Sequence, residues 1–270
     1  MNHVYFRRIL AAQRLRLAIV MLALAAWGSL MPVIWSEFGR QFEQLMDSGL
    51  VPDQFRQMTQ FGGGDITRLA GMIAIGFIHP IAVILLAVFT VGFTVASVAG
   101  ERQRGTLEVL LARPISRRTL YGTLFLASLV FVGLAILALL SGTLVGAALW
   151  NLLDELQTPN LPALWLNGVL LHLAFASIAL GASVTFDRLT PALAVTLAVL
   201  LMSYFFQVLG SLWPDADFLQ PYSLFHYLQP QKILEGKLDP FHLVLLSTVI
   251  VAGVIYALIV FPRRDLAAPT

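Results

Sequence analysis

The sequence predicts an all-α integral membrane protein with six transmembrane helices, an N-terminal interfacial helix and a short cytoplasmic helix between spans two and three. Three observations lead to this prediction. Of the 270 residues, 58% are hydrophobic and 12% are charged, whereas a soluble domain carries roughly 25% charged residues. Six apolar segments are long enough to cross about 30 Å of hydrocarbon as helices. One segment, 101–120, concentrates charge between two long stretches that are nearly free of it.

The first sixteen residues predict a helix that lies on the membrane surface. They mix apolar side chains with four arginines, Arg7, Arg8, Arg14 and Arg16. This composition is typical of an interfacial helix whose arginines contact anionic lipid headgroups. The alternative interpretation is that residues 1–16 extend the first span as one helix. These residues make a poor signal peptide, because the apolar run that follows is too long and no small-residue cleavage site comes after it.

The six predicted spans cover approximately residues 17–35, 69–99, 119–150, 161–185, 190–212 and 241–261. The second and third exceed the length that a bilayer requires, so we expect them to tilt or to project from it. His79 and Pro80 predict a kink in the second span, with the histidine bonded across helices or to backbone that the proline frees. The spacing Gly142-x-x-x-Gly146 in the third span predicts close helix packing within the chain.

The charge distribution predicts which side of the membrane each segment occupies. With a cytoplasmic N-terminus and alternating loops, the cytoplasmic segments hold twelve of the 17 basic residues and four of the 15 acidic residues. Their net charge is +8, and that of the extracytoplasmic segments 36–68, 151–160 and 213–240 is −6. Positive charge in cytoplasmic loops is the general rule for membrane proteins. We therefore expect both termini in the cytoplasm and no span that contains Asp, Glu, Lys or Arg.

Several classes of function are disfavoured by the composition. The chain has no cysteine, which excludes disulfides, thiol nucleophiles and thiolate metal sites. No metal site is expected, because the intramembrane histidines lack a carboxylate partner. Gly100 to Thr106 resembles a phosphate-binding loop in spacing only, since it lacks the lysine and the preceding strand. The basic residues concentrate on one side of a membrane, so no nucleic-acid partner is predicted.

The charged segment predicts a short amphipathic helix rather than a plain loop. Thr106 is the expected N-cap, and Glu108 in the first turn favours the helix dipole. Three leucines fall on one face at helical spacing: Leu107, Leu110 and Leu111. Pro114 is expected to end this helix, and Ser116 to cap the third span.

These residues resemble the signature of a known family. The pattern Glu101-Arg-x-x-Gly105-Thr106-Leu107-Glu108-x-Leu110-Leu111-x-Arg113-Pro114-x-Ser116-Arg117 is similar to that of ATP-binding-cassette (ABC) transporter permeases of the type-2 (ABC-2), exporter-like class. The resemblance implies that 101–114 is a coupling helix that docks on a separate ATPase subunit. It also implies that a second copy or a related permease completes the pathway, in a multi-pass protein of the cell inner or plasma membrane.

The resemblance implies a set of docking residues and assigns the chemistry to the partner. The docking residues would be Glu101, Gly105, Thr106, Leu107, Glu108, Leu110, Leu111, Arg113 and Pro114. ATP and Mg would bind to the ATPase, and this chain would hold no cofactor and no catalytic residue. An exposed leucine face would need a cover, and a partner protein is the simplest one. Glu101 would pair either with the ATPase or with an arginine of its own segment.

Three alternatives stay open at this point. The charged segment could be a solvated loop that only fixes the orientation of the chain. The protein could be an ATPase-coupled mechanical transmitter that drives an extracytoplasmic partner without moving a substrate. It could also be a membrane enzyme or a stand-alone structural protein, although the sequence shows no catalytic set of residues.

Overall fold

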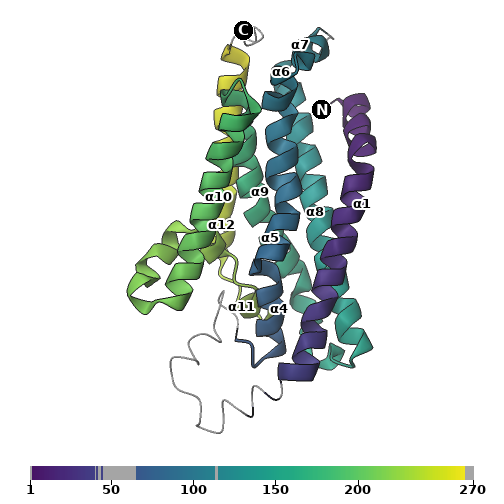
Figure 1. Ribbon diagram of the computed structural model, residues 1–270, viewed down its shortest axis with the longest axis vertical. Coiled ribbons are helices and arrows are strands. Elements are labelled where there is room, and N and C mark those ends of the chain that lie inside the picture. The colour runs from purple at the N-terminus through teal and green to yellow at the C-terminus, as the bar shows by residue number, and fades with distance from the viewer. Residues whose placement is uncertain (1, 40, 42–43, 45–64, 113–114, 265–270) are drawn as a thin grey trace.

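The structure is a bundle of long helices with shorter helices at both of its ends, as Figure 1 shows. This computed structural model describes residues 2–39, 41, 44, 65–112 and 115–264. No strand occurs in these ranges. The all-α prediction is therefore confirmed for the part of the chain that the structure describes.

The elements follow one another along the chain with the following limits. The long helices and the bent pair are α1 (His3–Ile34), α4 (Leu69–Ile78), α5 (Pro80–Ala87), α8 (Arg117–Leu149), α9 (Leu161–Thr185), α10 (Leu189–Leu212) and α12 (Pro240–Arg263). Three π-helical segments are η1 (Trp35–Gly39), η3 (Val88–Phe93) and η4 (Ala96–Gly100). The short helices are α6 (Glu101–Gln103), α7 (Thr106–Leu111), η5 (Leu153–Glu155), η6 (Thr158–Asn160), η7 (Pro214–Tyr222), η8 (Leu224–Tyr227) and α11 (Pro230–Leu234).

Five helices of the described chain are long and apolar enough to cross a membrane, and a bent pair makes a sixth if it crosses as one span. The five are α1, α8, α9, α10 and α12. The observed limits of α9, Leu161–Thr185, coincide with those predicted. The bent pair runs through Leu69–Ile78 and Pro80–Phe93, within the second predicted span.

The bend in this pair lies at His79 and measures 43°. Pro80 occupies the first turn of α5, where its missing N–H is not needed. The Nδ1 atom of His79 accepts a hydrogen bond from the backbone N–H of Ile81 at 3.3 Å. Its ring also lies 4.7 Å from that of Trp27 in α1. The predicted kink is therefore confirmed, and His79 bonds to a backbone N–H in the first turn of the helix that Pro80 begins.

The N-terminal residues do not form a separate helix. Residues from His3 onward belong to α1, which continues without a break to Ile34. The side chain of Asn2 accepts a hydrogen bond from the N–H of Tyr5 at 2.9 Å and caps the start. No glycine or proline occurs between His3 and Trp27, so nothing in this stretch interrupts the helix. The prediction of a distinct helix over 1–16 is wrong, and the alternative of an extended first span holds.

Helices α1 and α8 pack closely because glycines remove side chains from their contact. A Cβ atom at Gly142 of α8 would lie 1.9 Å from the carbonyl oxygen of Ala25 in α1. A Cβ atom at Gly28 of α1 would lie 2.2 Å from the carbonyl oxygen of Leu139. Only glycine allows two backbones to approach so closely. The close packing predicted from Gly142-x-x-x-Gly146 is confirmed within the chain.

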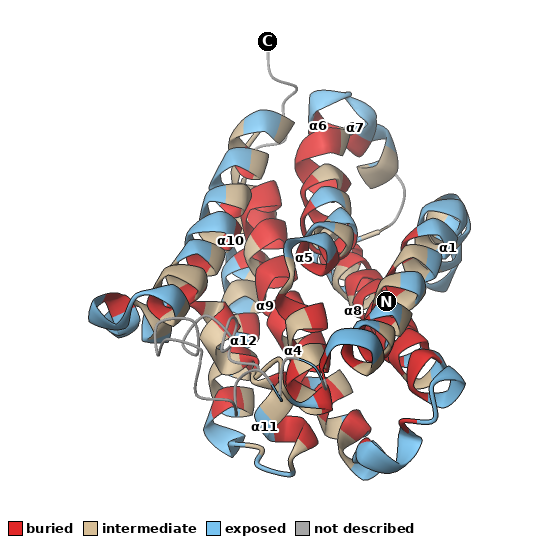
Figure 2. Ribbon diagram, turned by 60° about the horizontal axis from the view of Figure 1, so that its bottom comes forward, coloured by how far each residue is buried: buried red, intermediate tan, exposed pale blue. Residues whose placement is uncertain are grey.

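Helix α9 is the centre of the bundle. It is red along most of its length in Figure 2, whereas α10 and α12 are pale blue on one side. Many of its residues are alanine, glycine or serine, which lets neighbouring helices approach from several directions. Large apolar side chains of α10 and α12, such as Phe205 and Ile255, are more than half exposed. Such surfaces suit helices that face lipid.

The two ends of the bundle differ in what they carry. The start of α1, the end of α12 and the short helices α6 and α7 lie together at one end, at the top of Figure 1. The short helices of the predicted segment 213–240, η7, η8 and α11, lie nearer the opposite end. Most of the other predicted extracytoplasmic segment, 36–68, lies outside the described residues.

Candidate functional site

The charged segment forms a tight corner at the end of the bundle where α1 begins. Helix α6 continues the π-helical segment η4, and Gly105 then reverses the chain into α7. Gly105 has φ 71 and ψ 4, the left-handed conformation that glycine adopts without penalty. Its N–H donates to the carbonyl of Arg102 at 2.9 Å, which closes the last turn of α6. A residue with a side chain would be strained in this turn.

The turn is held by a small polar cluster within the segment. The hydroxyl of Thr106 donates to the carbonyl oxygen of Glu101 at 3.1 Å and also contacts the carboxylate of that residue. The guanidinium of Arg104 forms an ion pair with the same carboxylate. The prediction that Thr106 is the N-cap of α7 is therefore wrong. Gly105 occupies that position, and the hydroxyl of Thr106 turns back to Glu101. Two partners were expected for Glu101, the ATPase or an arginine of its own segment, and the structure shows the pair with Arg104.

The leucine face of α7 points into the chain. Leu107 is 1% exposed, and Leu110 and Leu111 are half-buried against the hydrophobic core. The prediction of an exposed leucine face is therefore wrong for Leu107, because the bundle itself covers it. Val109, on the other side of the helix, is 68% exposed.

The free surface of the corner lies opposite the leucines. It consists of exposed residues at helical spacing around the turn and along α7, which we name the exposed edge: Arg104, Gly105, Thr106, Glu108, Val109 and Ala112. Of the predicted docking residues, Gly105, Thr106 and Glu108 belong to this edge. Glu101 is half-buried beneath it, and Arg113 and Pro114 lie outside the described residues.

A buried arginine connects this corner to the turn between α9 and α10. Arg102 of α6 is 8% exposed, and its Nη1 lies 2.8 Å from Oδ1 of Asp187 in the turn between α9 and α10. Arg264, just past the end of α12, reaches the same Asp187 oxygen at 2.8 Å. Arg102 is buried and Asp187 is 44% exposed, so loss of the carboxylate would leave a buried arginine without this ion pair, which is costly. No pattern in the sequence predicted this cluster, although Asp187 is one of only four acidic residues in the predicted cytoplasmic segments.

Two further polar contacts fasten helix ends at this level. The side-chain oxygen of Gln103 accepts the first N–H of α10, from Leu189, at 2.8 Å. Arg117, at the start of α8, donates to the carbonyl oxygens of Phe261, Pro262 and Arg264 at 3.1, 3.2 and 2.6 Å. These carbonyls end α12 and have no partner within their own helix. The corner is thereby tied to the ends of α8, α9, α10 and α12.

The helix that leads into the corner contains two π-helical segments, η3 and η4. Backbone groups that this geometry releases are satisfied by Ser183 of α9. Its hydroxyl donates to the carbonyl of Val95 at 2.8 Å and accepts from the N–H groups of Val98 and Ala99 at 3.2 and 2.9 Å. Segments of π-helix often occur at functional sites. Here they lie where the second predicted span meets the corner.

The four N-terminal arginines Arg7, Arg8, Arg14 and Arg16 are all exposed on α1. Arg8 and Arg16 line a cleft that the exposed edge also borders, whereas Arg7 and Arg14 do not. The structure therefore brings two of these arginines to the corner and places the other two elsewhere.

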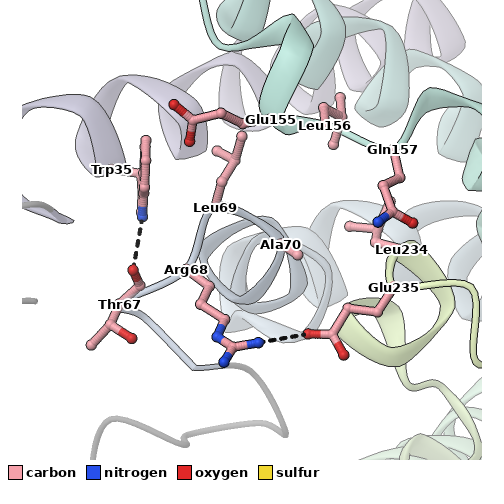
Figure 3. A pocket seen from close by; sticks show the side chains of 10 residues that line it. All are labelled: Trp35, Thr67, Arg68, Leu69, Ala70, Glu155, Leu156, Gln157, Leu234 and Glu235. Carbon is pink, nitrogen blue, oxygen red and sulfur yellow. Dashed lines mark hydrogen bonds and ion pairs between the residues drawn. The ribbon is translucent and has the colours of Figure 1, made fainter.

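A pocket of about 480 Å³ lies towards the opposite end of the bundle, where Figure 3 shows side chains from four separate parts of the chain. The indole N–H of Trp35 donates to the carbonyl of Thr67 at 3.4 Å, and Arg68 lies 3.6 Å from Glu235. A hydrogen bond from Gln231 is the largest effect that lowers the pKa of Glu235, which keeps this carboxylate ionised. Among the residues that the structure describes, no group of three or more His, Asp or Glu could hold a metal ion.

The model of a protein family described as ABC-2 family transporter protein matches residues 6–266, almost the whole chain. No curated protein and no solved structure matches the chain.

Proposed function

The chain belongs to the ABC-2 transporter family, and we propose that it is the permease subunit of an ATP-driven exporter whose ATP is hydrolysed by a separate ATPase subunit. The observation that carries this proposal is the corner formed by α6 and α7. It presents an exposed edge outward and is tied inward to the ends of four long helices. A force applied to the exposed edge would therefore reach the bundle through short, partly buried contacts.

In this proposal the bent pair crosses the membrane as one span, which makes six spans with both termini in the cytoplasm. The joint location of the start of α1 and the end of α12 at one end of the bundle supports an even number of crossings. The ATPase binds at the exposed edge and holds ATP and Mg. A second copy of the chain or a related permease completes the transport pathway.

The mechanism follows from the stiffness of the contacts at the corner. When the ATPase subunits close on ATP, they displace α7. The turn at Gly105 and the ion pair of Arg104 with Glu101 fix the orientation of α7 relative to α6, so the two helices move together. Arg102 passes the displacement to Asp187 and from there to Arg264. The π-helical segments and the bend at His79 lie in the helix that receives this displacement. We infer that these irregular turns absorb the change in length and direction.

The test of the proposed function is co-purification. The tagged chain, extracted in mild detergent from its own cells, is expected to bring down an ATPase subunit, and the complex is expected to hydrolyse ATP. The chain expressed alone is expected neither to bind nor to hydrolyse ATP. Saturable binding of ATP by the isolated, folded chain would contradict the assignment as a permease subunit.

The orientation is tested by labelling with a membrane-impermeant thiol reagent. Because the chain has no cysteine, single substitutions report without background, and the unaltered chain is the control. Leu153→Cys and Tyr222→Cys are expected to react in intact spheroplasts, since both residues are exposed in predicted extracytoplasmic segments. Ala112→Cys in the exposed edge is expected to react only after the membrane is opened. Labelling of Ala112→Cys from outside would show that the chain has the opposite orientation.

A further inference from the structure

A cleft of about 620 Å³ lies beside the corner, on the side away from the helix ends that hold it. Its walls come from the first turns of α1, from the π-helical segments η3 and η4, from α6 and α7, and from Leu124 of α8. The charged side chains that line it are Arg8, Arg16, Arg104 and Glu101. Since Arg104 already pairs with Glu101, Arg8 and Arg16 provide the net positive charge of the cleft.

The two arginines are available to a ligand. Both are exposed, and neither forms an ion pair with an acidic side chain in the described ranges. They lie eight residues apart on one face of α1, which corresponds to about 12 Å along the helix axis. Guanidinium groups bind phosphate through two parallel hydrogen bonds. The polar end of the cleft is therefore suited to a phosphate group and to the polar groups attached to it.

An apolar groove continues the same face of α1 and the facing helix away from the cleft. It measures about 460 Å³ and is lined by Ala23, Ala26, Trp27, Leu30, Ile81, Ile84 and Leu85. Trp27 follows Arg16 by eleven residues, or about 16 Å of helix. This distance is close to half of the roughly 30 Å hydrocarbon thickness of a bilayer. A chain that starts at the arginines would thus reach the middle of the membrane along this groove.

Gly92 joins the two parts of this surface. It is exposed and lines the cleft. It lies one helical turn beyond Val88, which is 38% exposed and follows Ile84 of the groove by one turn. A Cβ atom at Gly92 would meet only the carbonyl oxygen of Ala87, at 3.8 Å. The glycine therefore leaves an opening that a larger side chain would close without a clash in the backbone.

We propose that the cleft and the groove together form a specific site for one anionic phospholipid of the adjacent membrane leaflet. The phosphate lies between Arg8 and Arg16, and an acyl chain follows the apolar groove past Gly92 towards Trp27. Because Thr106, Val109 and Leu110 form one wall of the cleft, the bound headgroup supports α7 from the side opposite to its buried leucine. This site requires that the helices cross a membrane, as proposed above, but it depends neither on their orientation nor on the ATPase.

The test uses the purified, delipidated full chain and native mass spectrometry with added phosphatidylglycerol or phosphatidylcholine of identical acyl chains. We expect one phosphatidylglycerol to bind at least about tenfold more tightly than phosphatidylcholine. The double variant R8Q/R16Q is expected to lose this preference. The matched control R7Q/R14Q removes the same charge from the same helix outside the cleft, and is expected to keep it. Gly92→Phe, with every arginine intact, is expected to lose the bound lipid.

Three results would overturn the proposal. Equal loss of the preference in R8Q/R16Q and R7Q/R14Q would show that the arginines attract lipids only as a diffuse charge. Retention of the lipid by Gly92→Phe would show that the cleft is not the site. Inorganic phosphate, added as a competitor, is expected to displace no phosphatidylglycerol, and full displacement would indicate an anion site without a lipid. Size-exclusion chromatography of each variant distinguishes loss of lipid binding from loss of the fold. Co-purification of the ATPase with a variant that no longer binds lipid would show that the lipid site fails independently of the proposed function.

Discussion

Gly142→Ala is expected to destabilise the folded bundle by about 3 kcal/mol or more, at the upper end of the effects of overpacking. The added Cβ atom would lie 1.9 Å from the carbonyl oxygen of Ala25, a backbone atom that cannot move as a side-chain tip can. Helices α1 and α8 would have to separate along much of their contact, because their backbones approach each other just as closely at Gly28 and Gly146. The measurement is the thermal unfolding of the detergent-solubilised chain.

Gly122→Ala is the matched control for this experiment. Gly122 lies in the same helix, but a Cβ atom there meets no heavy atom within 4 Å. Alanine is favoured over glycine inside helices by about 1 kcal/mol, so Gly122→Ala is expected to leave the unfolding temperature unchanged or to raise it. If the two variants unfolded at the same temperature, the close contact of α1 with α8 would not contribute to the stability of the bundle.

The features that the sequence predicted well are governed by neighbouring residues. Pro80 bends the second span, and the hydroxyl oxygen of Ser116 caps α8 by accepting the N–H of Thr119 at 3.1 Å. The small residues of α8 allow a close approach to α1. In each case the physical cause lies within a few residues of the effect, or in a missing side chain, and can be recognised without knowing the fold.

The features that the sequence did not predict depend on distant partners. Arg102 is indistinguishable from the other arginines of its segment until the fold places Asp187, 85 residues further along the chain, beside it. The spacing of the leucines in α7 identified an apolar face, but spacing does not show whether a partner or the bundle covers it. The π-helical segments have no sequence pattern of their own, and Ser183 supports them from another helix.

Because Leu107 packs into the bundle and is not exposed, docking on the ATPase must be tested with other residues of α7. Leu107→Asp would place a charge where the native side chain is 1% exposed, which is expected to unfold α7 locally and to lose the partner for that reason alone. Loss of docking in this variant therefore says nothing about the contact surface. Substitutions that report on docking must lie in the exposed edge.

Val109→Asp is expected to weaken the association with the ATPase by roughly 30-fold, or about 2 kcal/mol, as for a central interface residue. Val109 is 68% exposed in the free chain, so the carboxylate is hydrated before docking and loses its water only in the complex. The unfolding temperature of the chain is expected to stay unchanged. Binding of the purified ATPase and the rate of ATP hydrolysis by the complex measure the effect.

Leu153→Asp is the control for Val109→Asp, since Leu153 is a partly exposed apolar residue, 42% exposed, in η5. It lies in a predicted extracytoplasmic segment and is expected to leave both ATPase binding and hydrolysis unchanged. Leu107→Asp, measured in parallel, is expected to lose binding together with stability. If Val109→Asp kept full binding and hydrolysis while Leu107→Asp lost them, the ATPase would not dock on the exposed edge. The corner of α6 and α7 would then serve only to fasten the helix ends through Arg102, Gln103 and Asp187.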